Sequence, residues 1–157
     1  HVARPLIFPL SNPTDSAEAH PLDLLTWTEG RALVATGSPF GAVSHGGRAV
    51  RIGQGNNVFI FPGVGLGALV SEARTVSDAV FVAAAEALAA EVAAAEIDEG
   101  SLYPAIGRLR RVTARVAEAV VRQARDEGVG RSLSDAEVPG AVAAAMWEPE
   151  YPELDPI

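Results

Sequence analysis

The sequence predicts an α/β fold in which a few strands are followed mostly by helices. Two short apolar runs, at residues 6–10 and 32–36, are bounded by turn residues, which is typical of strands buried in a parallel sheet. After residue 57 the apolar residues recur at spacings of three and four, which indicates helices. We therefore expect a strand-rich part at residues 1–57, a helical part at 58–147 and an extended tail at 148–157.

Turn residues divide the strand-rich part. Pro21 begins and Gly30 ends an expected short helix between the two strands. Gly46 and Gly47 mark the turn of a hairpin between residues 42–43 and 49–52. Because a parallel sheet usually has five or six strands and both of its faces covered, we expect that the chain is part of a larger sheet. The edges of 6–10 and 32–36 should then pair with another chain or stay exposed.

A glycine-rich string at residues 63–68 contains the spacing G-x-G-x-x-A, which imitates a dinucleotide-binding turn. That interpretation requires a second strand ending in an acid about 20 residues later, and the helical pattern of residues 77–95 offers none. We instead expect Asn56 and Asn57 to cap a helix that begins near Val58. Gly63 and Gly67 then lie on one face and allow close packing.

Three further helices follow from their caps and apolar stripes. Ser77 caps the first, and its expected stripe consists of Phe81, Ala84, Ala85, Leu88 and Val92. The second carries its arginines opposite a stripe of Leu109, Val112, Val116 and Val120, and stops at Gly128. A capping box at residues 134–137 begins the last helix, which we expect to continue through about Met146.

Composition excludes several classes of function. The 157 residues contain 20 acids and 12 bases, for a net charge of −8, and they lack both cysteine and lysine. Thiol catalysis, disulfides, cysteine-bound metals and lysine Schiff bases are therefore excluded, and the negative charge argues against nucleic-acid binding. Neither an apolar run of membrane-spanning length nor a secretion signal is present, so we expect no membrane partner and a cytoplasmic location.

Neutral polar residues follow the predicted strands, where α/β sheets place their ligands. Asn12 follows the first strand, Ser38 the second, and Gln-Gly-Asn-Asn at 54–57 precedes the glycine-rich helix. Their amides, with the free N–H groups expected at 57–60, form a hydrogen-bonding wall suited to a carboxylate substrate or a nicotinamide amide. Taken singly, Asn12 is also consistent with an Asx-turn and Asn57 with a helix cap.

The remaining polar and aromatic residues indicate structure rather than chemistry. His1, His20 and His45 lack metal-ligand spacing, so we expect no metal site, and no nucleophile–base arrangement is present. We expect Trp27 and Trp147 to be packing anchors and Glu86 and Glu91 to be helix-surface acids. We expect Arg108, Arg110 and Arg111 to form a solvated helix face or an interface.

Six strings, in order, carry a resemblance to a known family: RPLIFPLSNPT (4–14), WTEGRA (27–32), TGSPF (36–40), GQGNNVFIFPG (53–63), LYP (102–104) and WEPEY (147–151). Together they resemble the C-terminal part of the malic enzymes, which oxidatively decarboxylate malate to pyruvate and CO2 with NAD or NADP and a divalent metal. The resemblance implies that the chain is the incomplete C-terminal portion, over residues 1–157, of a Rossmann-like NAD(P)-binding domain.

The resemblance also implies roles for the polar residues. Asn12 matches the family asparagine that reaches both malate and the cofactor, Ser38 lies on the cofactor side, and Asn56 and Asn57 match the pair at the malate carboxylates. The family's catalytic tyrosine and lysine and the ligands of its Mg or Mn have no counterpart here. We therefore expect no catalytic residue in this chain, a missing N-terminal part of the same enzyme as partner, and a homo-oligomer.

Two hypotheses about the chain itself follow. In the first it is a segment of a malic enzyme that supplies substrate and cofactor contacts and is inactive alone. In the second it is a stand-alone, non-catalytic interaction module that keeps a remnant of the malic-enzyme fold. Turnover of malate by the 157-residue chain alone would contradict the first hypothesis.

Overall fold

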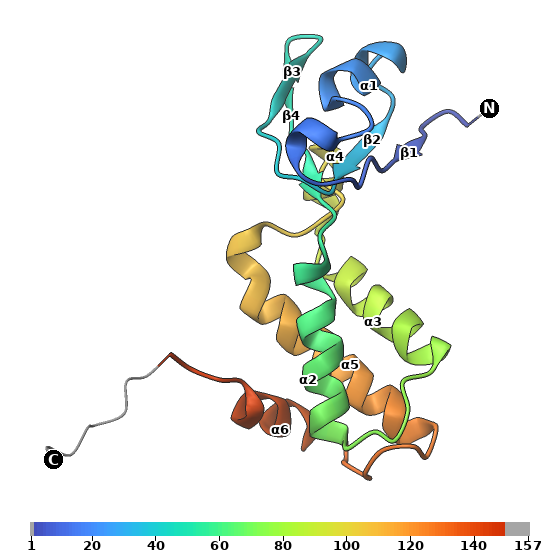
Figure 1. Ribbon diagram of the computed structural model, residues 1–157, viewed down its shortest axis with the longest axis vertical. Helices are drawn as coiled ribbons and strands as arrows, with labels where there is room; N and C mark the ends of the chain where they lie inside the picture. Colours follow the sequence, from blue (N-terminus) through green and yellow to red (C-terminus); the bar gives the residue numbers. More distant parts are fainter. Residues whose placement is uncertain (1, 150–157) are drawn as a thin grey trace, which may run out of the picture.

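A computed structural model describes residues 2–149 and confirms the predicted α/β class (Figure 1). Its central feature is a parallel sheet of three short strands in the order β1-β2-β5. β1 (Leu6–Ile7) pairs with β2 (Leu33–Thr36), and β2 pairs with β5 (Gly53–Gln54). The sequence did not predict β5, because two residues that include a glycine carry no apolar pattern.

One face of this sheet is covered by the other elements of the strand-rich part. The helix α1 (Pro21–Trp27) has Pro21 in its first turn, as predicted, and follows the short 3-10 turn η1 (Thr14–Ser16). The predicted hairpin is confirmed as β3 (Val43–His45) and β4 (Arg48–Val50). The buried core between α1 and the sheet consists of Leu24, Leu25, Ala32 and Val34.

The first strand is shorter and more exposed than predicted. We expected a buried strand over residues 6–10, but the strand ends at Ile7, and Leu6, Phe8 and Leu10 are 61%, 44% and 47% exposed. Alternation along an extended chain places these three side chains on the face opposite Ile7, which packs toward α1. By contrast β2 is paired on both sides within the chain and fully buried, so the expectation that its edge pairs with another chain or stays exposed was wrong.

Helices make up the rest of the described chain, and Figure 1 shows most of them at the end of the molecule away from the strands. They are η2 (Asn57–Phe59), α2 (Phe61–Ser71), α3 (Asp78–Ala90), α4 (Ala94–Asp98), η3 (Ile106–Arg108), α5 (Leu109–Asp126) and α6 (Val138–Ala145). None of the helices within residues 2–149 is long and apolar enough to cross a membrane.

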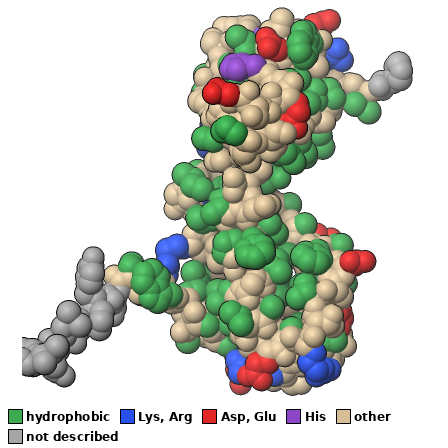
Figure 2. Space-filling model, viewed as in Figure 1, with side chains coloured by type: hydrophobic (Ala, Val, Ile, Leu, Met, Phe, Trp, Pro, Cys, Tyr) green, Lys and Arg blue, Asp and Glu red, His purple; other side chains and the backbone are tan. Residues whose placement is uncertain are grey.

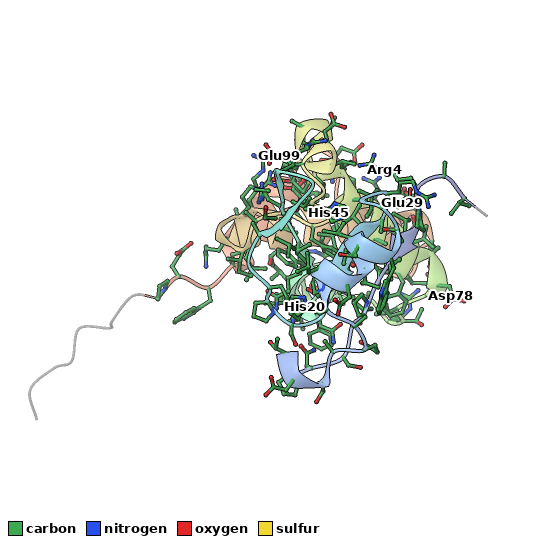
Figure 3. All side chains as sticks on the ribbon, turned by 90° about the horizontal axis from the view of Figure 1, so that it is seen from above. Arg4, His20, Glu29, His45, Asp78 and Glu99 are labelled. Carbon is green, nitrogen blue, oxygen red and sulfur yellow. The ribbon has the colours of Figure 1, made fainter. Side chains whose placement is uncertain are left out.

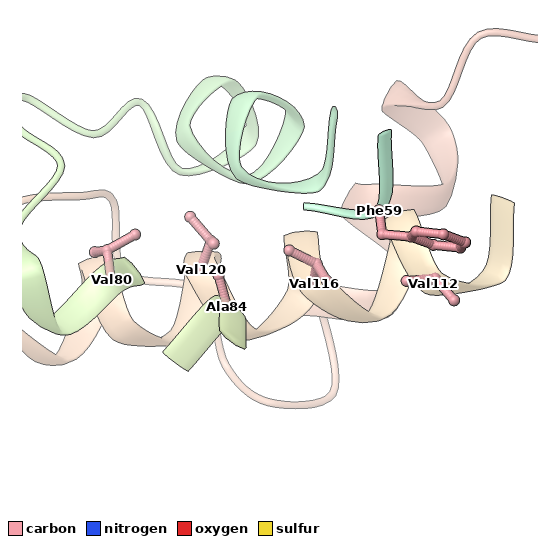
Figure 4. Packing of buried hydrophobic residues seen from close by; sticks show 6 residues of the cluster. All are labelled: Phe59, Val80, Ala84, Val112, Val116 and Val120. Carbon is pink, nitrogen blue, oxygen red and sulfur yellow. The ribbon is translucent and has the colours of Figure 1, made fainter. Parts of the chain in front are cut away.

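The long helix α5 is the centre of the helical part. Its predicted apolar stripe packs against α2, α3 and η2, and the resulting core is formed by Phe59, Val80, Ala84, Val112, Val116 and Val120 (Figure 4). The predicted close packing of α2 is confirmed. A Cβ atom at Gly63 would lie 2.5 Å from the Cβ of Val116, and one at Gly67 would lie 2.6 Å from that of Val120. Only glycine permits this approach of the two helices.

The predicted stripe of α3 was wrong in part. Ser77 caps the helix as expected, with its Oγ accepting from the N–H of Val80 at 3.2 Å. Val80 and Ala84 face the core, whereas Phe81 is 54% exposed and Ala85 is exposed as well. The helix is apolar around most of its circumference, and α5 covers only one side of it.

Several side chains lie elsewhere than expected. Trp27 and Trp147 are 70% and 75% exposed, so they are not packing anchors within this chain. Glu91 is not a surface acid, because its side chain is only 9% exposed and lies 3.0 Å from the Arg111 guanidinium. Arg108 and Arg110 form ion pairs with Glu96 and Glu148.

The boundaries of the last helix also differ from the prediction. At the predicted capping box, the N–H and hydroxyl of Ser134 donate to Glu137 at 2.8 and 2.7 Å, but the regular helix begins only at Val138. Most of the predicted extended tail, residues 150–157, lies outside the described residues.

Candidate functional site

The three predicted polar segments meet at the carboxyl ends of the strands. The N–H of Gly37, after β2, donates to the carbonyl of Pro9 at 3.0 Å, and the N–H of Gly55, after β5, donates to Thr36 at 2.8 Å. The Gln54 amide donates to the carbonyl of Gly37 at 3.2 Å and so links the ends of β5 and β2. This edge is where open α/β sheets bind ligands.

Glycine at position 37 permits this arrangement. A Cβ atom there would lie 2.0 Å from the carbonyl oxygen of Leu10, so no larger residue fits beneath the segment that leads to Asn12. The Thr-Gly-Ser-Pro sequence that begins at the last residue of β2 therefore allows the loop after β1 to cross directly over the loop after β2.

Ser38 orients the side chain of Asn12. Its hydroxyl donates to Asn12 Oδ1 at 2.7 Å, and Ser38 itself is 1% exposed, with its carbonyl accepting from the Thr36 hydroxyl at 2.8 Å. Because Oδ1 accepts this bond, the exposed Asn12 amide directs its NH2 group away from Ser38 as a donor. Ser38 thus acts on the site through Asn12, and its direct contact with a cofactor stays a prediction.

Asn56 is oriented in the same sense. Its Oδ1 accepts from the N–H of Val58 at 2.9 Å and caps η2, which leaves its NH2 group to donate, while Asn57 beside it is exposed. The expectation that the N–H groups of residues 57–60 are free to bind an anion was mostly wrong. Those of Val58, Phe59 and Ile60 are bonded to Asn56 or Asn57 within the turn, so the side-chain amides are the available donors.

All three asparagines of the chain lie at this edge of the sheet. The sequence predicted these residues but missed how the loop that carries Asn12 is held. The Glu18 carboxylate accepts from the N–H and the hydroxyl of Ser11, at 3.2 and 2.8 Å. Hydrogen bonds from the Glu18 backbone and from Ser11 lower the pKa of this carboxyl group, so Glu18 stays ionised and closes the loop.

A cleft of about 430 Å³ lies next to Asn56 and Asn57. Its walls come from the segment after β1, from α3 and from the residues around Tyr103, and none of its lining residues is charged. The lining consists of Leu6, Phe8, Leu10, Gly55, Asn56, Asn57, Ile60, Ala85, Leu88, Ala89, Leu102 and Tyr103. A few amides beside an apolar wall are typical of sites for small organic ligands.

A second, charged cleft of about 300 Å³ lies near Arg4, Glu29, His45 and Glu99 (Figure 3). It borders Ala32 and Leu33, at the amino end of β2, which is the opposite edge of the sheet from the asparagines.

Within the described residues, no three His, Asp or Glu side chains are placed to hold a metal ion. His20 caps α1 by accepting from Leu22 N–H at 3.3 Å and contacts Phe40.

A parallel sheet with helical cover and amide donors at its carboxyl edge defines the chain as part of a Rossmann-like nucleotide-binding domain. Comparison with known families agrees, because residues 1–125 match the family described as malic enzyme, NAD binding domain. The chain belongs to the malic enzyme family.

Curated relatives and solved structures are similar to this chain over nearly its whole length. NAD-dependent malic enzymes from Pseudomonas aeruginosa and Aeromonas hydrophila are 45% and 44% identical to it over 96% of the chain. Malic enzyme structures from Pyrococcus horikoshii and Entamoeba histolytica cover 89% and 88% of it, with TM-scores of 0.64 and 0.68 and identities of 30% and 26%.

These similar proteins are much longer than the chain. It spans 27% of the length of the Pseudomonas and Aeromonas enzymes, and 29% and 26% of the two solved chains.

Proposed function

We propose that this chain is the part of a malic enzyme that binds malate and the nicotinamide end of NAD, and that it serves the oxidative decarboxylation of malate to pyruvate and CO2. The observation that carries the proposal is the pair of oriented amides. Asn12 and Asn56 each have their oxygen occupied, at 2.7 and 2.9 Å, and each therefore offers its NH2 group at the same edge of the sheet.

The substrate chemistry fits these donors. Malate carries two carboxylates, and amide NH2 groups hydrogen-bond carboxylate oxygens without adding a charge of their own. We propose that Asn56 and Asn57 donate to the malate carboxylates, and that Asn12 donates both to malate and to the nicotinamide carboxamide. Two or more such bonds fix the orientation of C2 of malate relative to the nicotinamide ring, which is the positioning that hydride transfer requires.

The residues present fit the nicotinamide end of NAD but not a metal. An aromatic ring with one carboxamide suits an apolar cleft bordered by amides, and when bound NAD supplies the acceptor for the hydride from C2 of malate. The family's Mg or Mn finds no ligand group among residues 2–149, so we derive no step through a metal here. NAD rather than NADP is proposed because relatives at 45% identity are named NAD-dependent malic enzymes.

The chain's own residues bind and orient, and the proton transfers need other groups. Decarboxylation requires a base for the C2 hydroxyl and an acid for the enolate, and the cleft beside Asn56 and Asn57 offers only the Tyr103 phenol, with no carboxylate, histidine or lysine in its described lining. We therefore propose that the remainder of a malic enzyme completes the site, in a cytoplasmic homo-oligomer. The 157-residue chain alone should not reduce NAD in the presence of malate.

A chimaeric enzyme tests this proposal. In it, called the graft below, this chain replaces the matching 151 residues of the Pseudomonas aeruginosa NAD-dependent malic enzyme. We expect the graft to reduce NAD with malate, and Asn12→Ala or Asn56→Ala to lower kcat/KM by about 10- to 100-fold, because each removes a hydrogen bond to a charged or reacting group.

Gln123→Ala is the matched control for these variants, since Gln123 lies on α5 and donates to Glu127 just after the end of that helix, away from the site. The proposal is wrong if a folded, NAD-reducing graft keeps its kcat/KM in both asparagine variants.

A further inference from the structure

Tyr103 lies where the strand-bearing end of the molecule joins the helical end. It borders the cleft beside Asn56 and Asn57, and its backbone lies against β5, where a Cβ atom at Gly53 would be 3.1 Å from the backbone nitrogen of Tyr103. Figure 1 shows the segments that follow β5 and α4 side by side at the narrow middle of the molecule, and Figure 2 shows hydrophobic side chains exposed there. Tyr103 is therefore in position to act on the turn that carries these two asparagines.

The side chains of Tyr103 and Leu10 both pack on Gly55, the residue directly before Asn56. A Cβ atom at Gly55 would lie 3.1 Å from Cδ2 of Leu10 and 3.3 Å from Cε2 and Cζ of Tyr103. These distances are shorter than the roughly 3.5–4.0 Å of an ordinary contact between carbon atoms. The two side chains fit against position 55 in this way because it is glycine.

Leu10 connects this contact to Asn12, which follows it two residues later. The carbonyl of Leu10 lies over Gly37, where a Cβ atom would approach it to 2.0 Å, and its side chain lies on Gly55. Leu10 is therefore held against the loops that follow β2 and β5. The position of the Asn12 amide relative to the Asn56 amide thus depends on how Leu10 and Tyr103 pack on Gly55.

Tyr103 itself is anchored to buried parts of the molecule. Its ring centroid lies 6.1 Å from that of Phe59, which is buried in the core around α5. Its carbonyl accepts a hydrogen bond of 2.9 Å from the hydroxyl of Ser101, which is also buried. The contacts with Phe59 and Gly55 are both made by the ring of Tyr103, so the ring transmits the position of the helical core to the asparagine turn.

We propose that Tyr103 is a positioning residue whose packing on Gly55 sets the spacing of the Asn12 and Asn56 amides and thereby the length of the dicarboxylate that the site accepts. The inference rests on the proposed function, in which these amides hold malate. A dicarboxylate that is one methylene longer cannot meet two fixed donors equally well, and a misfit of one methylene typically changes discrimination by about 10- to 200-fold.

Inhibition of the graft by two dicarboxylates tests the proposal. Succinate has the same spacing of carboxylates as malate, glutarate is one methylene longer, and both can compete with malate for amide donors. Tyr103→Leu removes the ring, and Tyr103→Phe keeps the ring and removes the hydroxyl. Leu133→Ala is the control for lost packing, because Leu133 packs against the separate core around Val121 and Val138.

We expect succinate to inhibit the graft about tenfold more tightly than glutarate, and Tyr103→Leu to reduce this preference to about twofold. Tyr103→Phe and Leu133→Ala should keep the preference of the unmodified graft. An unchanged preference in Tyr103→Leu would overturn the proposal. So would an equal loss in Tyr103→Phe, because the phenol hydroxyl would then bind the ligand directly.

An NMR measurement on the 157-residue chain tests the packing step without any turnover. The chain has only three asparagines, so an isotope label confined to asparagine side-chain amides gives three NH2 signals. Gly55→Ala should shift the Asn12 signal through Leu10, whereas Gly65→Ala, which points into open space, should shift none. An unchanged Asn12 signal in Gly55→Ala would overturn the proposal, whether or not the graft folds.

The two measurements separate this proposal from the proposed function. A folded graft that cannot oxidise malate, together with an Asn12 signal that responds to Gly55→Ala, would contradict the proposed function and leave the coupling of the two amides standing. An active graft that loses turnover in Asn56→Ala but keeps its succinate preference in Tyr103→Leu would do the reverse.

Discussion

The buried hydroxyl of Ser38 donates a 2.7 Å hydrogen bond to Oδ1 of Asn12, which lies 26 residues earlier in the chain and is exposed at the end of the preceding strand segment. The Ser38 side chain thereby determines which end of the Asn12 amide remains free to hydrogen-bond. Under the proposed function, the orientation of a substrate-binding amide depends on a residue that is itself almost completely buried.

Removing that hydroxyl should disturb the reaction without disturbing the fold. Ser38→Ala leaves Asn12 free to rotate, so we expect kcat/KM of the graft for malate to fall by about fivefold, corresponding to one neutral hydrogen bond. Ser134→Ala, at the start of the last helical region, is the control. Unchanged steady-state kinetics in Ser38→Ala would show that Asn12 needs no such partner.

The packing of α2 on α5 predicts opposite effects at neighbouring glycines. Gly67→Ala places a methyl group 2.6 Å from the Cβ of Val120 and should lower the free energy of unfolding by about 1–3 kcal/mol. Gly65→Ala points into open space in the same helix and should raise it by about 1 kcal/mol. Urea unfolding of the two variants measures both, and equal effects would refute the close packing.

The turn that follows α1 predicts a stabilising substitution at Glu29. Glu29 has φ of 54°, the left-handed conformation at the end of a helix where glycine is preferred. Glu29→Gly should therefore raise the free energy of unfolding by about 1 kcal/mol, as measured by thermal or urea denaturation. Glu86→Gly, inside α3, should lower it by a similar amount, and a loss of stability in Glu29→Gly would contradict the assignment.

Acid should weaken the contact between α4 and η3. The N–H of Ala93 and the guanidinium of Arg108, at 3.0 and 2.7 Å, hold the pKa of Glu96 below its ordinary value of 4.5. Because the pKa is lowered in the folded state, this stabilisation is complete above pH 4.5 and is lost as the pH falls through the folded-state pKa.

Arg108→Gln should accordingly flatten the acid side of the stability profile below pH 4.5. Arg74→Gln, which removes a bond to the Gly128 carbonyl and no carboxylate contact, should leave the shape of that profile unchanged. Identical pH profiles for the wild type and Arg108→Gln would exclude the Arg108–Glu96 pair as a source of this dependence.

Local pattern was enough to name the residues of the candidate site, whose roles stay predictions. The residues after each strand are recognisable because turns and caps depend on neighbours within a few positions, and Asn12, Ser38, Asn56 and Asn57 were all named on that basis. The direction of the amides was not predictable. It depends on a bond between Ser38 and Asn12 and on the crossing of Leu10 over Gly37, and both are contacts between distant parts of the chain.

The sequence by itself determined the α/β class, the cap at Ser77, the hairpin and the identity of the polar residues, because each of these follows from the order of residues along a short stretch. Only the tertiary structure decided which apolar faces are covered. Phe8, Phe81 and Trp147 are as hydrophobic as the core residues, yet they lie exposed, since burial depends on what other part of the chain lies opposite a side chain. That difference separates the buried core around α5 from the exposed apolar side chains of the β1 segment.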